Sequence, residues 1–146
     1  MIYQIEVKEI GTFWRLNGKP HREDGPAVEW TDGTKEWYRN GNLHREDGPA
    51  VEYVNGTKSW YRNGNLHRED GPAIERVSGT KFWYRNNKLH REDGPAIEYA
   101  NGSKEWWLNG REYTEEEFNR ATNKVIPEYT MEEAIKLIGH EFKIKK

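Results

Sequence analysis

Residues 37–58 of the chain read Trp-Tyr-Arg-Asn-Gly-Asn-Leu-His-Arg-Glu-Asp-Gly-Pro-Ala-Val-Glu-Tyr-Val-Asn-Gly-Thr-Lys, and the same phrase begins again at Trp60. Related copies begin at Trp14 and Trp83, and a shortened copy begins at Trp106. A period of 23 residues is set by the histidines of the phrase, which are His21, His44, His67 and His90. Self-similarity at one constant period indicates a repeat array, in which each unit buries its apolar face against its neighbours.

The composition suits a thin, single-domain structure. Of the 146 residues, 34% are hydrophobic and 33% are charged, which is too polar for a thick two-layer core. The 23 Lys and Arg nearly balance the 25 Asp and Glu, so duplex nucleic acid and membranes are disfavoured as partners. The lack of cysteine excludes disulfides and thiolate metal sites. The first ten residues alternate and carry two glutamates, so we expect neither a signal peptide nor a membrane span, and a cytoplasmic location.

Each repeat is predicted to form a β-hairpin. Residues 50–54 and 57–62 are strand-like runs, and each is followed by Asn-Gly, the strongest short hairpin signal, because both central residues of a type I′ turn have positive φ. A two-residue turn at Asn55-Gly56 would place Val51 opposite Trp60. The predicted core is the ladder of equivalent pairs Val28/Trp37, Val51/Trp60, Ile74/Trp83 and Ile97/Trp106.

The two ends of the chain differ from the repeats. Residues 2–9 alternate with period two, which predicts a strand that covers the edge of the first repeat. After the partial fifth unit, Thr114 and Glu117 form a capping box that predicts a helix start. A second box opening at Thr130 predicts another helix, and the alternation after His140 is compatible with a final strand.

The predicted fold is therefore mainly β. It is an elongated antiparallel β-hairpin repeat array (MORN-like) over residues 1–110, followed by a C-terminal α-helical cap over residues 111–146. The array consists of the N-terminal edge strand and of repeats that start at residues 14, 37, 60 and 83, with a partial repeat at 106.

The rhythm of aromatic residue, Asn-Gly, His and Gly over residues 12–110 resembles the MORN repeat family, whose units are β-hairpins laid side by side. Leu-His-Arg-Glu-Asp-Gly-Pro-Ala stands where those repeats have His-Gly-x-Gly, and is similar to repeats in proteins of large tailed bacteriophages and other large DNA viruses. The resemblance implies an accessory viral protein without catalytic residues. MORN proteins generally act as binding scaffolds or assembly platforms, and likeness of fold alone does not name a partner.

The His-Arg-Glu-Asp segment contains the residue types of acid–base catalysis and metal binding. It occurs four times with identical neighbours, whereas a catalytic site is normally singular. Equivalent histidines two strands apart would be separated by about 10 Å, too far for one zinc ion. We therefore predict a structural role, with aspartates in Asx-type turns, arginine–glutamate pairs and histidines beside the neighbouring tryptophans. No enzymatic activity, cofactor or metal is predicted.

The third repeat departs most from the shared phrase. Arg76 replaces an aromatic residue, Phe82 replaces a glutamate or serine, and Asn87 replaces a glycine. These departures indicate either drift in a tolerant array or a contact patch, because arginine and aromatic residues dominate interface energetics. The predicted pairing places Arg76 opposite Lys81, with Phe82 on the other face. The predicted partner-binding residues are Arg76, Lys81, Phe82, Tyr84, Tyr61 and Tyr38.

The sequence predicts a non-catalytic viral (phage) accessory protein that binds and modulates or inhibits a host macromolecule in the host cytoplasm. A host protein is the expected partner, and an antiviral defence component is one such target. The alternative is a small-ligand sequestering protein that holds a nucleotide signal on the exposed aromatic stripe. The sequence leaves open whether the chain forms a homo-oligomer.

Overall fold

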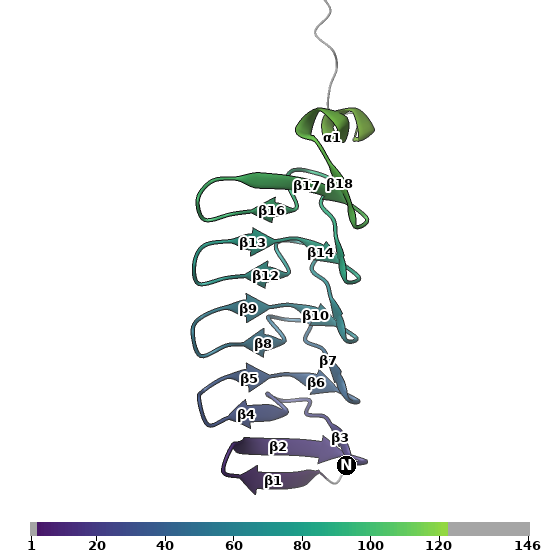
Figure 1. Ribbon diagram of the computed structural model, residues 1–146. Coiled ribbons are helices and arrows are strands. Elements are labelled where there is room, and N and C mark those ends of the chain that lie inside the picture. The colour runs from purple at the N-terminus through teal and green to yellow at the C-terminus, as the bar shows by residue number, and fades with distance from the viewer. Residues whose placement is uncertain (1–2, 123–146) are drawn as a thin grey trace, which may run out of the picture.

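The computed structural model describes residues 3–122 as a tall stack of short antiparallel strands with one helix at its C-terminal end (Figure 1). The predicted mainly β repeat array with a helix after the last unit is confirmed. The predicted second helix and final strand lie outside the described residues. Within residues 3–122, no helix has the length and apolar character that crossing a membrane requires.

The elements follow the repeat. They are β1 (Gln4–Lys8), β2 (Gly11–Leu16), β3 (Lys19–Pro20), β4 (Val28–Trp30), β5 (Lys35–Glu36), β6 (Tyr38–Arg39), β7 (Asn42–Leu43), β8 (Val51–Glu52), β9 (Lys58–Ser59), β10 (Tyr61–Arg62), β11 (Asn65–Leu66), β12 (Ile74–Glu75), β13 (Lys81–Phe82), β14 (Tyr84–Arg85), β15 (Lys88–Leu89), β16 (Ile97–Glu98), β17 (Lys104–Leu108), β18 (Arg111–Tyr113) and α1 (Glu115–Ala121).

Each full repeat contributes two hairpins. The first hairpin, such as β8–β9, joins a long sheet in the order β1-β2-β4-β5-β8-β9-β12-β13-β16-β17-β18. The second kind of hairpin forms a separate two-stranded sheet in the repeats that start at residues 37, 60 and 83, as in β10–β11, whereas β3 of the first repeat pairs with β2 of the long sheet. The β10–β11 turn at Asn63-Gly64 has positive φ at both residues (50° and 81°), as a two-residue type I′ turn requires. The Asn55-Gly56 turn differs, because only its glycine has positive φ.

The predicted register of the first hairpin is wrong by one residue. Val51 lies opposite Ser59, and not opposite Trp60. The loop is longer than two residues, because the Thr57 N–H donates to the Asn55 side-chain oxygen at 2.9 Å and only the glycine of that Asn-Gly pair has positive φ. A shift of one residue moves every side chain of a strand to the opposite face. The valine and tryptophan of each predicted core pair therefore lie on opposite faces.

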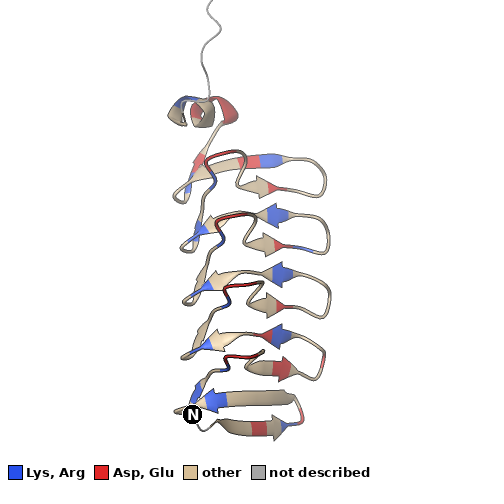
Figure 2. Cartoon of the chain, turned by 180° about the vertical axis from the view of Figure 1, so that it is seen from behind, with Lys and Arg blue, Asp and Glu red and all other residues tan. Residues whose placement is uncertain are grey.

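The two faces of the long sheet have different chemistry. One face carries a row in which glutamate and lysine alternate across every strand pair, so that Glu52 lies between Lys35 and Lys58 (Figure 2). We call this row the ion-pair ladder for its alternating charges, although its lysines are not within ion-pair distance of its glutamates and Glu52, Glu75 and Glu98 pair with arginines instead. Its members are Glu29, Lys35, Glu52, Lys58, Glu75, Lys81, Glu98 and Lys104. Opposite charges in direct cross-strand pairs favour this register over its neighbours.

The core lies on the other face and is only one side chain thick. Val28, Val51 and Ile97 are buried there, as predicted, while their predicted tryptophan partners are half-buried on the ladder side. The alanine of each Gly-Pro-Ala is fully buried, and its carbonyl accepts the main-chain N–H of the tryptophan that opens the same repeat, as in the 2.8 Å bond from Trp37 to Ala50. Main-chain bonds such as the one from the Gly64 N–H to the Leu43 carbonyl at 2.8 Å, rather than a thick core, join one repeat to the next.

Both ends are closed much as predicted. Strand β1 pairs antiparallel with β2 along its whole length, and Ile5 and Val7 alternate with charged residues. The capping box at Thr114 and Glu117 is present, and α1 begins after it. The Phe118 side chain is 1% exposed, and the helix packs on β17 and β18. A buried aromatic side chain anchors this short helix to the last unit.

Candidate functional site

The arginine of His-Arg-Glu-Asp stacks on a tryptophan ring and forms hydrogen bonds within its own repeat in every full copy. In the third copy, the Arg68 guanidinium lies 4.1 Å from the Trp60 ring centroid. Its Nε donates to Asp70 at 2.8 Å, and its Nη1 donates to the Pro72 carbonyl at 3.3 Å and to Glu75 at 2.9 Å. The same stacking occurs at 4.0–4.2 Å in the other copies. The predicted arginine–glutamate pairing is confirmed, and the aspartate, predicted to form an Asx-type turn, pairs with the arginine.

The position of this arginine side chain leaves no room for a side chain at the glycine of Asp-Gly-Pro. A Cβ atom at Gly71 would lie 2.9 Å from the Arg68 Cζ, although the glycine is not in the left-handed region of φ. The planar guanidinium therefore contacts both the Trp60 ring and the glycine backbone. Cation–π stacking and charge-assisted hydrogen bonds hold the loop against the ladder side of the sheet.

The histidine connects each repeat to the next. The Nδ1 of His67 accepts the Asn86 main-chain N–H at 3.3 Å, and its Nε2 lies 3.4 Å from Glu69. His44 and His90 make the equivalent pair of contacts. Hydrogen bonding to His67 and the nearby Arg62 lower the pKa of the Glu69 carboxyl below its ordinary value. The histidine main chain also donates to the tryptophan carbonyl, as from His67 to Trp60 at 3.1 Å, so each histidine lies beside the neighbouring tryptophan as predicted while its ring bonds to the following turn.

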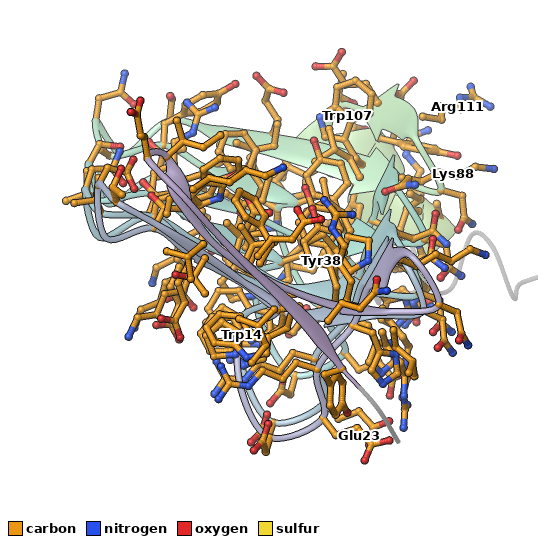
Figure 3. The ribbon with its side chains drawn as sticks, turned by 90° about the horizontal axis from the view of Figure 1, so that it is seen from below. Trp14, Glu23, Tyr38, Lys88, Trp107 and Arg111 are labelled. Carbon is orange, nitrogen blue, oxygen red and sulfur yellow. The ribbon has the colours of Figure 1, made fainter. Side chains whose placement is uncertain are left out.

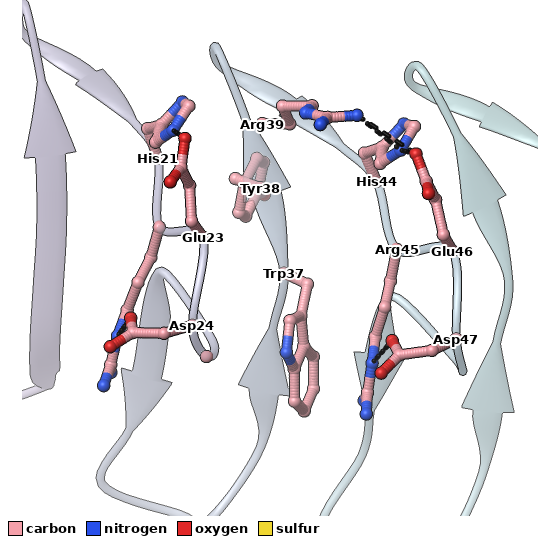
Figure 4. Close-up of a pocket in the computed structure, with 12 residues that line it drawn as sticks. His21, Glu23, Asp24, Trp37, Tyr38, Arg39, His44, Arg45, Glu46 and Asp47 are labelled. Carbon is pink, nitrogen blue, oxygen red and sulfur yellow. Dashed lines mark hydrogen bonds and ion pairs between the residues drawn. The ribbon is translucent and has the colours of Figure 1, made fainter.

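These loops bound a row of open grooves. The groove between the first two His-Arg-Glu-Asp segments has a volume of about 700 Å³, and Trp37 lies along its floor (Figure 4). Its walls are ion pairs, such as Arg45–Asp47 at 2.9 Å. Similar grooves follow in the next repeats. Among the described residues, no group of His, Asp or Glu has an arrangement that could hold a metal ion. The groove side chains are occupied in holding the array.

The opposite side of the sheet carries a continuous aromatic surface. Trp14 and Tyr38 lie on opposite sides of the ribbon when the array is viewed along its length (Figure 3). We call the surface on the Tyr38 side the aromatic face. It comprises Trp30, Tyr38, Tyr53, Tyr61, Phe82, Tyr84, Tyr99 and Trp107. All of these rings are half-buried except that of Tyr53, which is 42% exposed. The repeat therefore displays aromatic rings at regular intervals along one side.

A glutamate sits between two aromatic residues near each end of this face. The Glu36 carboxylate accepts the Trp30 indole N–H at 2.9 Å. Burial, together with the charge of the Glu36 carboxylate and a hydrogen bond to it, raises the pKa of Tyr38 to about 12. Glu105 accepts the Tyr99 hydroxyl at 2.7 Å and the Trp107 indole N–H at 3.0 Å. Two carboxylates are thus fixed among aromatic side chains.

These two glutamates differ from the other half-buried glutamates of the sheet. Glu52, Glu75 and Glu98 each form an ion pair of 3.0 Å or less with an arginine of their own repeat, and Glu29 lies 3.7 Å from Arg22. Within residues 3–122, Glu36 and Glu105 form no ion pair with a lysine, arginine or histidine. A half-buried carboxylate without a cation carries a charge that a partner could neutralise.

The third repeat has no glutamate at the position of Glu36 and Glu105. It has Phe82 there, which contacts Arg76. Arg76 stacks on the Phe82 ring at 4.8 Å, on the aromatic face. The prediction that these two residues lie on opposite faces is therefore wrong, as is the pairing of Arg76 with Lys81. Lys81 lies on the ion-pair ladder between Glu75 and Glu98. The one-residue error in register accounts for both corrections.

Of the predicted partner-binding residues, the structure places all except Lys81 on one face. The Tyr38, Tyr61 and Tyr84 stripe is as predicted. Asn87 has positive φ (61°), and its side chain accepts the Leu66 N–H at 2.7 Å, so this departure also has a structural reason.

The sequence analysis missed Glu36 and Glu105. The sequence does contain a signal for these two glutamates. In each repeat, one residue and the residue six positions after it change together from repeat to repeat. These pairs are Trp30/Glu36, Tyr53/Ser59, Arg76/Phe82 and Tyr99/Glu105. Comparison of the chain with protein-family models and with curated proteins gives no match.

Proposed function

We propose that the protein is a non-catalytic interaction protein whose aromatic face binds a host macromolecule. The observation that carries this proposal is the row of partly exposed aromatic side chains with two uncompensated carboxylates. Contiguous aromatic surface of this kind is typical of binding sites, and tyrosine, tryptophan and arginine are the residues that contribute most to binding. The opposite side supports the assignment, because the arginines that line its grooves are already paired with acidic residues of the array.

The viral setting of the proposal rests on the resemblance to repeats of large phages and other large DNA viruses. An accessory protein of this kind acts in the host cytoplasm by binding a host protein and modulating or inhibiting it. Components of antiviral defence are among the candidate partners. The non-catalytic role is supported by the repeated, internally bonded His-Arg-Glu-Asp segments. A repeat array presents a rigid, extended surface, which suits binding better than enclosing a reacting group.

Photo-crosslinking from each face tests the proposal. A photoreactive aromatic residue replaces Tyr61 on the aromatic face in one variant, and Lys58 on the ion-pair ladder in the control. Each is irradiated in host lysate. We expect a discrete crosslinked product from position 61 that the unlabelled protein competes away. Crosslinking only from position 58, or none that unlabelled protein competes away, would refute the aromatic face as the binding surface.

The alternative function is sequestration of a small nucleotide ligand. The observation that favours it is Arg76, a cation next to Phe82 and Tyr84, where a base could stack and a phosphate could pair. The Glu36 and Glu105 carboxylates oppose an anionic ligand on the same face. A nucleotide that binds the folded state raises the unfolding temperature. A nucleotide panel that leaves this temperature unchanged would exclude the alternative, and a large rise would replace the first proposal.

A further inference from the structure

The two ends of the long sheet differ in how they are covered. At the C-terminal end, α1 packs on β17 and β18 and buries Phe118 (Figure 1). At the N-terminal end, β1 covers the first repeat, but among residues 3–122 no strand pairs with the outer edge of β1. This strand has no bulge, because each of its residues pairs with one residue of β2. A regular, unpaired strand edge is a template for pairing with another strand.

The free main-chain groups of this edge belong to Ile5 and Val7. On the inner side of the hairpin, the Trp14 N–H donates to the Ala27 carbonyl at 2.8 Å, so the main chain of Trp14 is directed toward the first repeat and away from β1. Ile5 is the partner of Trp14, and in an antiparallel ladder the main-chain groups of such a pair are directed away from each other. Val7, two residues further, has the same direction as Ile5. The N–H and C=O groups of both residues therefore point out from the array.

The side chains of Ile5 and Val7 are apolar, whereas exposed edge strands commonly carry charge. Ile5 is 59% exposed and Val7 is 78% exposed. Val7 pairs with Thr12, and Thr12 pairs with Glu29 of the ion-pair ladder, so Val7 lies at the end of that row without a charge. Pairing with another strand would remove both aliphatic side chains from water.

A second copy of β1 fits this edge. In an antiparallel pair centred on Glu6, Ile5 of each copy lies opposite Val7 of the other, so every outward N–H meets an outward carbonyl. A register shifted by one pair in either direction would need Glu9, which lies in the turn, or Tyr3, which precedes the strand. The register centred on Glu6 also gathers the exposed aliphatic side chains of both copies into one cluster.

The charges on the other side of β1 are compatible with this pairing. The Glu6 carboxylate lies 3.0 Å from Lys8 Nζ and 3.5 Å from Arg15 Nε of its own chain. The two Glu6 side chains face each other at the axis, and Lys8 of each copy is diagonal to Glu6 of the other, within reach of a long side chain. Each carboxylate therefore has Lys8 of both copies and its own Arg15 as neighbours, so cations outnumber the opposed carboxylates.

We infer that two copies of this chain pair through the outer edges of β1 and form a symmetric dimer with one continuous sheet. The two-fold axis passes between the two Glu6 residues, perpendicular to the sheet, so the aromatic faces of both copies lie on the same side. Because each copy uses the same surface, and α1 covers the other end of the array, pairing stops at the dimer. The inference goes beyond the proposed function and does not depend on it, although the dimer would offer a partner two aromatic faces.

Sedimentation equilibrium of the full-length chain over a concentration series tests the inference. We expect the mass to rise from the 17.3 kDa of one chain to twice that value, with no larger species. Because one strand pair is a small interface, the expected dissociation constant is in the micromolar range. A chain that stays monomeric throughout the series, or that continues to associate beyond the dimer, would overturn the inference.

Charge placed on the edge tests whether β1 is the contact. The double change Ile5→Lys with Val7→Lys leaves the pairing of β1 with β2 in place and should weaken dimerisation about tenfold or more. The control Ile10→Lys changes a similarly exposed aliphatic residue (57%) in the adjoining turn and should dimerise normally. Circular dichroism shows whether each variant is folded. If the folded double variant dimerises like the parent, the contact is not the β1 edge.

Disulfide trapping locates the axis without placing charge on the edge. The chain has no cysteine, so each variant carries a single thiol. Glu6→Cys places two cysteines directly opposite each other in a non-hydrogen-bonded pair, with Cα atoms about 4.5 Å apart, which a disulfide can span. In Lys8→Cys the two thiols lie about 14 Å apart along the strands. We expect oxidation to link Glu6→Cys into a covalent dimer and to leave Lys8→Cys unlinked. Linking of Lys8→Cys alone would overturn the assigned register and axis.

Discussion

The stacked arginine of each repeat is predicted to be a main source of stability, and Arg68→Lys tests this. Lysine keeps the charge and the aliphatic stem but cannot stack a plane on Trp60 or donate from several nitrogens at once. The loss of stacking is worth ~0.5–1 kcal/mol. Loss of the charge-assisted bond to the half-buried Glu75 or to the Pro72 carbonyl adds ~1.5–3 kcal/mol. Because Asp70 is exposed, its pair adds little. We expect a destabilisation of about 2–4 kcal/mol.

The same repeat offers a matched control. Arg62 pairs with Glu69 at 3.1 Å, but it is 56% exposed and stacks on no ring. Arg62→Lys should therefore cost less than about 0.5 kcal/mol. Both variants are unfolded with urea while tryptophan fluorescence and circular dichroism are recorded together, because a repeat array can unfold in more than one step. If Arg68→Lys costs no more than Arg62→Lys, stacking and hydrogen bonding by the arginine do not stabilise the array.

Three further predictions follow from the same contacts. His67→Ala removes the acceptor for the exposed Asn86 N–H and should cost about 0.5–1.5 kcal/mol, measured by urea unfolding; an unchanged midpoint would show that water replaces the imidazole. The pKa of Glu69 is lowered in the folded state from an ordinary value of 4.5, so its contribution is present above that pH and is lost as the pH falls through the folded-state pKa. Glu69→Gln should therefore flatten the loss of stability below about pH 4.5 in acid titrations, and an identical pH profile would contradict this. The double change Arg76→Tyr with Phe82→Glu recreates the tyrosine–glutamate pair of the next repeat. It should keep the unfolding temperature within a few degrees of the parent, whereas a large fall would show that the stacked pair has no equivalent replacement.

Much of the aromatic face could be predicted from the sequence, because regular recurrence reveals which positions share a column. The Tyr38, Tyr61 and Tyr84 stripe needed only the period and the alternation of a strand. The importance of Glu36 could not be seen in the same way, because glutamate on a predicted strand is normally solvated. It is special only because Trp30 and Tyr38 enclose it while no arginine reaches it. Whether an arginine reaches a glutamate depends on which face of the sheet the His-Arg-Glu-Asp loop covers, and this is a property of the tertiary structure.

The sequence by itself determined the period, the number of units, the places of the turns and the helix start at Thr114. These features follow from local preferences: Asn-Gly favours positive φ, alternation favours strands, and a capping box satisfies the first N–H groups of a helix. They require no knowledge of distant residues.

Only the tertiary structure decided the register and therefore the identity of each face. One extra residue in the loop around Asn55 moves Val51 from Trp60 to Ser59, and local turn preferences differ too little to exclude either loop. Contacts between strands of neighbouring repeats select the register. Only one of the two registers places lysine opposite glutamate along the ladder and puts Glu75 and Trp60 on the same face, where Arg68 can contact both. That collective preference places the aromatic rings together on the other side.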